Sequence, residues 1–94
     1  MQYTTEQILK YLKDYHIYKG KVEIGVATES ICQDVERLEK AISVLDEMSY
    51  GIISDRYLDK LPVRRICGSY GYSKSGLIYK TNIIIQELAK IMSE

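Results

Sequence analysis

The stretch LPVRRICGSYGYSKSGLIYKTNIII, residues 61–85, decides the fold, because it reads as a helix, a three-residue turn and a second helix. Counted from the valine at its third place, Cys67 is fifth, Gly71 ninth and Leu77 fifteenth. This is the spacing of a helix-turn-helix. Two helices that cross near a right angle touch at Cys67 and Leu77, so a small residue there faces one that fills the gap. The spacing predicts helices over residues 63–70 and 73 to about 92.

The residues between the two helices suit a turn. A positive φ angle strains any residue with a Cβ atom but not glycine, which favours Gly71 at this place. Ser73 is a typical N-cap, whose hydroxyl accepts a hydrogen bond from an otherwise unpaired backbone amide of the next helix. Pro62 suits the start of the first helix, where its missing N–H costs nothing.

Charge is unevenly distributed along a chain whose formal net charge is zero. Residues 1–49 hold nine acids and six bases, whereas residues 50–94 hold four acids and seven bases. Residues 62–86 contain no acid and four bases: Arg64, Arg65, Lys74 and Lys80. A local positive field favours phosphate contact even in a neutral chain. We interpret residues 1–49 as an acidic helical part, and residues 50–94 as the part that binds double-stranded DNA.

The start of the second helix carries side chains that suit the major groove, where the recognition helix of a helix-turn-helix lies. Five side chains are expected to face base edges: Ser73, Lys74, Ser75, Ile78 and Tyr79. Ile78 would contact a thymine methyl group. Three bases are expected to bind phosphates: Arg64, Arg65 and Lys80. The sequence therefore predicts a sequence-specific regulator of transcription.

Residues 55–88, DRYLDKLPVRRICGSYGYSKSGLIYKTNIIIQEL, resemble the sigma-factor region-four type of helix-turn-helix, in the form carried by small bacteriophage late-transcription regulators of the ArpU and RinA-like kind. The matching parts are RYL at 56–58, LPVRRIC, GYSKS and Leu88. The first half of the chain matches these regulators in outline only. Gly76 and Lys80 depart from the pattern, which has Thr or Arg and an apolar residue there. The resemblance implies late-gene control in a phage or prophage, with RNA polymerase as a further partner.

Three more helices are expected, which makes about five in an all-α domain. They cover residues 4–15, 28–50 and 52–61. Residues 16–27 contain two glycines and break the helical period, so a loop is expected there. The first helix has a buried stripe of Ile8, Leu12 and Tyr15. Ser54 or Asp55 is expected to cap the short helix before the motif.

The helix over residues 28–50 has Thr28 as its N-cap and Gly51 as its stop. Apolar residues recur along it at alternating spacings of four and three: Ile31, Val35, Leu38, Ile42 and Leu45. Three residues are expected to widen this buried seam: Ala41, Val44 and Met48. The opposite face is expected to be exposed: Gln33, Asp34, Glu36, Arg37 and Lys40.

The last helix carries two adjacent apolar stripes. One is Leu77, Ile84, Leu88 and Ile91, and the other is Ile78, Ile85 and Met92. Such a broad apolar face exceeds what a core of this size needs, so we expect a homodimer. Its two recognition helices would lie roughly 34 Å apart, one turn of DNA.

The sequence shows no signal of a membrane-spanning or secreted protein and no motif of a metal site. No apolar run reaches 18 residues and no signal sequence is evident, so we expect a cytoplasmic protein of a bacterial host cell and no membrane partner. Cys32, Cys67 and His16 form no ligand motif, so neither a metal nor a cofactor is expected, and both cysteines are expected to be reduced and buried.

We expect no enzyme, because paired carboxylates, a nucleophile with its base and a GxxxxGK loop are all missing from the sequence. The alternative to DNA binding is a protein-interaction module, in which the same helices bind host RNA polymerase or another host protein. The acidic first half would suit a basic partner of that kind.

Overall fold

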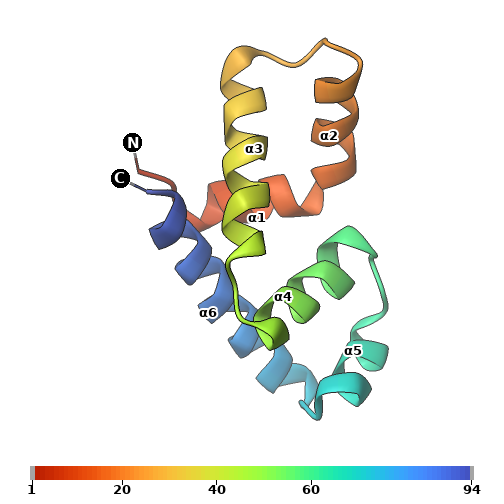
Figure 1. The fold of residues 1–94 in the computed structure, drawn as a ribbon. Coiled ribbons are helices and arrows are strands. Elements are labelled where there is room, and N and C mark those ends of the chain that lie inside the picture. Colours follow the sequence, from red (N-terminus) through yellow and green to blue (C-terminus); the bar gives the residue numbers. More distant parts are fainter. Residues whose placement is uncertain (1, 94) are drawn as a thin grey trace.

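Seven helical elements follow one another in a computed structural model that describes residues 2–93 (Figure 1). They are α1 (Thr5–Lys13), α2 (Tyr15–Glu23), α3 (Glu29–Ser43), α4 (Glu47–Ile53), the π-helix η1 (Ser54–Leu58), α5 (Val63–Tyr70) and α6 (Lys74–Met92). The prediction of an all-α chain of about five helices is confirmed, with six α-helices and no strand over the described residues.

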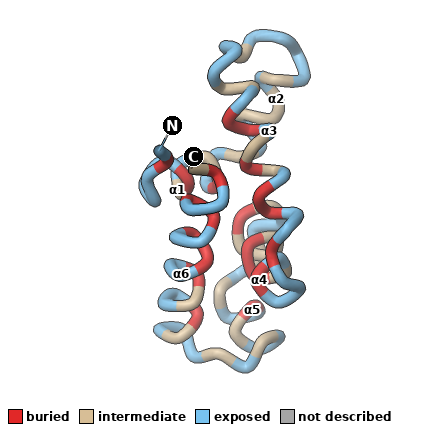
Figure 2. Tube along the Cα trace, turned by 60° about the vertical axis from the view of Figure 1, so that its left-hand side comes forward, coloured by how far each residue is buried: buried red, intermediate tan, exposed pale blue. Residues whose placement is uncertain are grey.

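α6 is the element on which the others pack, since it contacts α1, α3, α4 and α5. Its buried side chains extend along its whole length: Leu77, Thr81, Ile84, Ile85, Leu88, Ala89 and Met92. They form the stripe that Figure 2 shows in red along α6. Most of the broad apolar face is therefore used inside the molecule. Ile78 and Ile91 are the exceptions to the predicted stripes, because they are 40% and 42% exposed.

The loop expected over residues 16–27 is wrong, because residues 15–23 form α2. Side-chain contacts with α3 hold this helix: the Tyr15 hydroxyl donates to Glu39 at 2.6 Å, and the Lys19 ammonium lies 3.1 Å from the same carboxylate. These contacts outweigh the poor helix propensity of Gly20. The first helix accordingly ends at Lys13, two residues earlier than expected.

The helix expected over residues 28–50 is two helices. Its start is confirmed, because the Thr28 hydroxyl accepts from the Ile31 amide at 3.2 Å. The chain then leaves α3 after residue 43, and Asp46 caps α4 by accepting from the Ser49 amide at 3.2 Å. Gly51 therefore lies inside α4 and stops no helix, and α4 continues directly into η1 without a cap at Ser54 or Asp55. The apolar period continues across this corner, which is why it did not reveal the break.

The exposed fractions of several side chains also differ from the predictions. Val44 and Met48, expected in the seam, are 67% and 43% exposed because they lie at the corner between α3 and α4. Asp34, expected on the wet face, is 8% exposed. Cys32 and Cys67 are free, but each is only half-buried.

Asp34 is buried because two tyrosines satisfy its carboxylate. The hydroxyls of Tyr3 and Tyr11 each donate to one of its oxygens at 2.5 Å. Hydrogen bonds of this kind to a charged acceptor are stronger than those between neutral groups, and they offset the cost of burying the charge. Asp34 joins α3 to Tyr3 before α1 and to Tyr11 within it, and Glu39 joins α3 to Tyr15 of α2. Phenylalanine has no hydroxyl and could not form these bonds.

These hydrogen bonds predict an alkaline limit to the stability. Burial and the bond to Glu39 raise the pKa of Tyr15 to about 12, and burial and the bond to Asp34 raise the pKa of Tyr11 above its usual value. Because the folded pKa lies above the unfolded one, near 10, this stabilisation is complete below pH 10 and is lost as the pH rises towards 12. Circular dichroism should show helix content falling over that range, together with late tyrosine ionisation by absorbance.

Replacing Tyr15 with phenylalanine should lower the unfolding midpoint at neutral pH and weaken its dependence on alkaline pH. Tyr79→Phe, which removes the hydroxyl of a ring 70% exposed, should leave both unchanged. Tyrosines that all ionise near pH 10 in the folded chain would contradict the role given to these bonds.

A second prediction concerns two helical glycines. A Cβ atom at Gly51 would collide with the hydroxyl of Tyr70, whereas a Cβ atom at Gly68 meets nothing within 4 Å. Gly68→Ala should therefore stabilise by about 0.5–1 kcal/mol. Gly51→Ala should be less stable than Gly68→Ala by about 1–3 kcal/mol, the usual cost of overpacking. Urea unfolding measures both, and equal stabilities would show that α4 does not approach Tyr70 this closely.

Candidate nucleic-acid interface

The helix-turn-helix expected from the sequence is present as α5, residues 71–73 and α6. Gly71 has a φ angle of 72°, in the left-handed region that glycine tolerates. The amides of Gly71 and Tyr72 both donate to the Cys67 carbonyl, at 2.9 and 3.2 Å, and so close the end of α5. The Ser73 hydroxyl accepts from the Gly76 amide at 3.1 Å and caps α6 as predicted.

Contacts with η1 fix the motif to the rest of the molecule. Arg56 of η1 donates to the Thr81 hydroxyl at 2.9 Å, and that hydroxyl donates to the Leu77 carbonyl at 2.7 Å. The Tyr70 hydroxyl donates to Asp55 at 3.2 Å. Because Thr81 is 1% exposed, the first hydrogen bond satisfies a buried polar group and ties the middle of α6 to η1.

Seven of the eight predicted DNA-contacting residues are exposed, and together we term them the basic face: Arg64, Arg65, Ser73, Lys74, Ser75, Ile78 and Tyr79. They lie on α5 and the beginning of α6, at the end of the molecule farthest from the hairpin that α2 and α3 form over residues 15–43, termed the α2–α3 hairpin (Figure 1). Tyr79, 70% exposed, is the most exposed aromatic residue among the described large hydrophobic side chains. The structure thus brings these predicted residues together at one end of the fold.

The cations of the basic face have no partner within residues 2–93. No ion pair or hydrogen bond involves the side chains of Arg64, Arg65 or Lys74 in this part of the chain. Arg64 of α5 and Lys74 of α6 both line a groove of about 420 Å³. An unpaired, hydrated cation keeps its full attraction for an anionic partner.

Lys80, the eighth residue, lies apart from the others. It is half-buried, and its charge acts on Asp46, the N-cap of α4. Hydrogen bonds from Ser49 lower the pKa of Asp46, and the positive charge of Lys80 lowers that pKa further. On the side towards α1, Glu6 shares a groove with Asn82 and Gln86. Acids therefore bound the basic face on both flanks of α6.

Asn82 is a surface residue that the sequence analysis missed. It is exposed, and it follows Ser75 by seven residues and Tyr79 by three, so all three share one side of α6. An asparagine amide can form paired hydrogen bonds with the edge of adenine. Its seven-residue spacing from Ser75 was the one sequence signal that places Asn82 on this side of α6. Nothing else about an asparagine in an apolar run indicated a role in binding.

Other chemistry finds little support in the described residues. No group of three or more His, Cys, Asp or Glu side chains that could hold a metal ion occurs there. The Nε2 atom of His16 lies 2.8 Å from the Leu58 carbonyl, so this ring joins α2 to η1. None of the helices between residues 2 and 93 is both long and apolar enough to cross a membrane.

Fold and surface define a small all-α chain with an exposed, basic helix-turn-helix. Comparison with known proteins finds no matching family model, no matching curated protein and no matching solved structure. The resemblance to sigma-factor region four and to phage regulators therefore stays a prediction.

Proposed function

We propose that the chain binds double-stranded DNA in a sequence-specific way and regulates transcription, with α6 in the major groove. The observation that carries the proposal is the set of three unpaired cations, Arg64, Arg65 and Lys74, beside the capped, exposed start of α6. A duplex presents dense phosphate charge that such cations neutralise, with release of counterions. The major groove is about 12 Å wide and admits one α-helix.

The exposed side chains of α5 and α6 divide between two tasks, the reading of base edges and the binding of phosphates. Ser75, Tyr79 and Asn82 occupy the outward side of α6 and would meet base edges. Arg64 and Arg65 on α5 would bind phosphates, as the first helix of such a motif crosses the backbone. The positive end of the α6 dipole adds to the attraction. Lys80 contributes less than expected, since Asp46 opposes its charge.

The setting that we propose, late-gene control in a phage or prophage, rests on the resemblance of residues 55–88 to the region-four regulators. The chain would then work beside RNA polymerase at a promoter. A bacterial cytoplasm is the compartment that this setting requires.

A second candidate is a protein-interaction module without DNA binding. It is favoured by three exposed apolar side chains on the α2–α3 hairpin, which protrudes from the body of the molecule (Figure 1). These are Ile17, Ile24 and Val26, which are 59%, 75% and 65% exposed. Exposed apolar groups on a projection are typical of a docking surface. Host RNA polymerase is the partner we would test first.

Two alanine variants test the division of roles on the basic face. Lys74→Ala should change which base pairs are preferred, because this residue sits at the start of the recognition helix. Arg65→Ala should weaken binding to all duplexes alike, and it should reduce the slope of log K against log salt by about one unit. Lys21→Ala, which removes an exposed base from α2, is the matched control and should change neither property.

A salt titration against random-sequence duplex separates the two candidate functions. DNA binding predicts measurable affinity at about 50 mM salt that falls steeply as salt increases. The absence of binding under this condition would favour the protein-interaction module. Binding that survives both Lys74→Ala and Arg65→Ala unchanged would show that another surface contacts the DNA.

A further inference from the structure

The exposed residues near the beginning of α6 carry no charge after Lys74. Between positions 75 and 83 they are Ser75, Ile78, Tyr79, Asn82 and Ile83. Ile78, Tyr79 and Ile83 are 40%, 70% and 38% exposed, so three large apolar side chains gather within six residues. Lys80, in the same stretch, is half-buried and its charge acts on Asp46. Apolar side chains gathered on a surface indicate a partner that is itself partly apolar.

We propose that α6 recognises a short run of A·T base pairs in the major groove, and that Ile78 and Ile83 contact thymine methyl groups on the two strands. The inference rests on the proposed DNA-binding function and names the class of sequence which that function selects. Lys74, at the beginning of the helix, is left to read a guanine at the end of the run, since lysine pairs with the major-groove edge of guanine.

The chemistry of the major groove links these side chains to A·T pairs. Thymine presents a C5-methyl group there, which apolar side chains contact, and an asparagine amide pairs with the edge of adenine. Guanine is read mainly by arginine or lysine, and cytosine by glutamate or aspartate. None of the exposed residues between positions 75 and 83 is of these four types. G·C pairs would therefore find no matching side chain along this stretch.

Helical geometry arranges the five side chains around one direction. At about 100° per residue, Asn82 lies within about 20° of Ser75 around the helix axis, and Tyr79 within about 40°. Ile78 and Ile83 lie on opposite sides of Ser75, at about 60° and about 80°. A helix that inserts with Ser75 and Asn82 towards the base pairs therefore directs Ile78 towards one strand and Ile83 towards the other. Both strands should then contribute thymine.

Two acids limit the stretch of α6 that can lie against DNA. Glu87 follows Ile83 by one turn, and Glu6 of α1 lines a groove together with Asn82. Because carboxylates repel phosphates, the contact with DNA ends close to Ile83. From Ser75 to Ile83 the helix rises by about 12 Å, which spans at most about four base pairs at about 3.4 Å each.

Selection from a random-sequence duplex library, with the full chain at about 50 mM salt, tests the inference. The enriched duplexes should share a run of about three to four A·T pairs with thymine on both strands. Deoxyuridine lacks the methyl group of thymine but keeps its pairing with adenine. Its substitution for each contacted thymine should weaken binding about fourfold, as the loss of one buried CH₂ group would, and fluorescence anisotropy measures this change.

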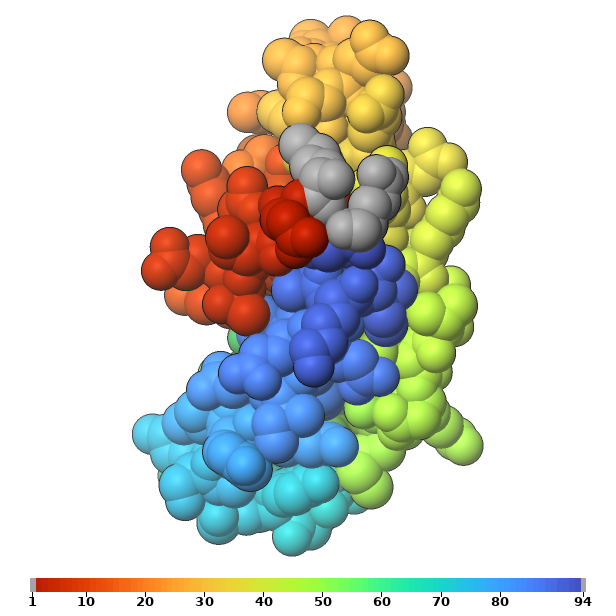
Figure 3. All heavy atoms as spheres, turned by 90° about the vertical axis from the view of Figure 1, so that its left-hand side faces the viewer, coloured from red at the N-terminus to blue at the C-terminus, as the bar shows by residue number. Residues whose placement is uncertain are grey.

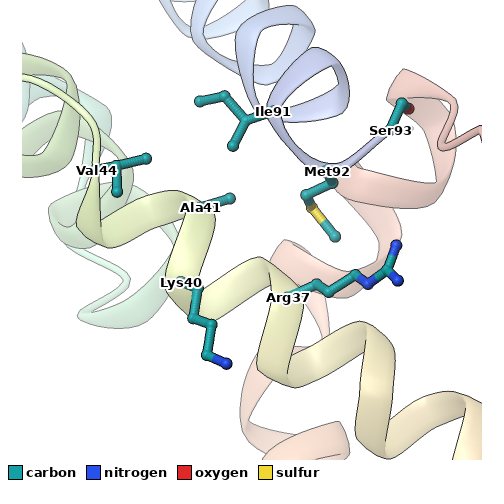
Figure 4. A pocket seen from close by; sticks show the side chains of 7 residues that line it. All are labelled: Arg37, Lys40, Ala41, Val44, Ile91, Met92 and Ser93. Atoms are coloured by element: carbon teal, nitrogen blue, oxygen red, sulfur yellow. The ribbon is translucent and has the colours of Figure 1, made fainter.

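A pair of alanine variants assigns the methyl contacts to their side chains. Ile83→Ala should abolish the response to deoxyuridine on one strand only, because Ile78 still contacts the thymine on the other. The matched control is Ile91→Ala, which shortens the same residue type on the same helix at similar exposure, 42% against 38%. Ile91 lies near the end of α6, beside the groove that this helix forms with α3 (Figure 4). This variant should keep the full response on both strands, and circular dichroism should show native helix content for both variants.

The outcomes separate this inference from the function on which it rests. Binding without enrichment of A·T pairs, or deoxyuridine that replaces thymine without effect, would overturn the inference and leave DNA binding intact. An Ile91→Ala variant that loses the response to deoxyuridine as Ile83→Ala does would also overturn it. Absence of binding to every duplex in the library at this salt would overturn the proposed function, and the inference with it.

Discussion

One apolar stripe on α6 holds the molecule together. Leu77, Ile84 and Leu88 are fully buried at three levels of the helix, and α6 as a whole contacts α1, α3, α4 and α5. A helix that forms the floor of the core along its length leaves little of itself free. In Figure 3 it lies across the front of the molecule between α1 on one side and α3–α4 on the other. Only its outward side and its beginning remain available for function, which is why the basic face lies where it does.

The two ends of the molecule are stabilised by different physics. Around α5 and α6 the contacts are mainly aliphatic, with Ile66 and Leu77 buried without exposure. Around α2 many of them are polar, since this helix has no buried residue and is held by the bonds from Tyr15 and Lys19 to Glu39 and by the bond between His16 and the Leu58 carbonyl. Hydrogen bonds of this kind contribute only modest net free energy each. We therefore expect the α2–α3 hairpin to open more readily than the motif.

Predictability from the sequence followed the same division. The motif could be predicted nearly to the residue, because Gly71 and Ser73 are local signals that depend only on residues close to them in the sequence. α2 could not, since its stability comes from tyrosine contacts with residues far along the chain. The break between α3 and α4 was hidden because Leu45 continues the apolar period across it. On the site, exposure of the basic face followed from helical spacing, whereas the effect of Lys80 on the pKa of Asp46 depended on the unpredicted break between α3 and α4.

The central claim is that the beginning of α6 and the adjacent side of α5 form the surface that meets DNA. Nuclear magnetic resonance tests it most directly, by following the backbone amides during titration with a duplex at low salt. The account predicts that the largest shifts fall on residues 64–65 and 73–82, with α2 nearly unchanged. Shifts that concentrate instead on residues 17–26, or no shifts at about 50 mM salt, would contradict it.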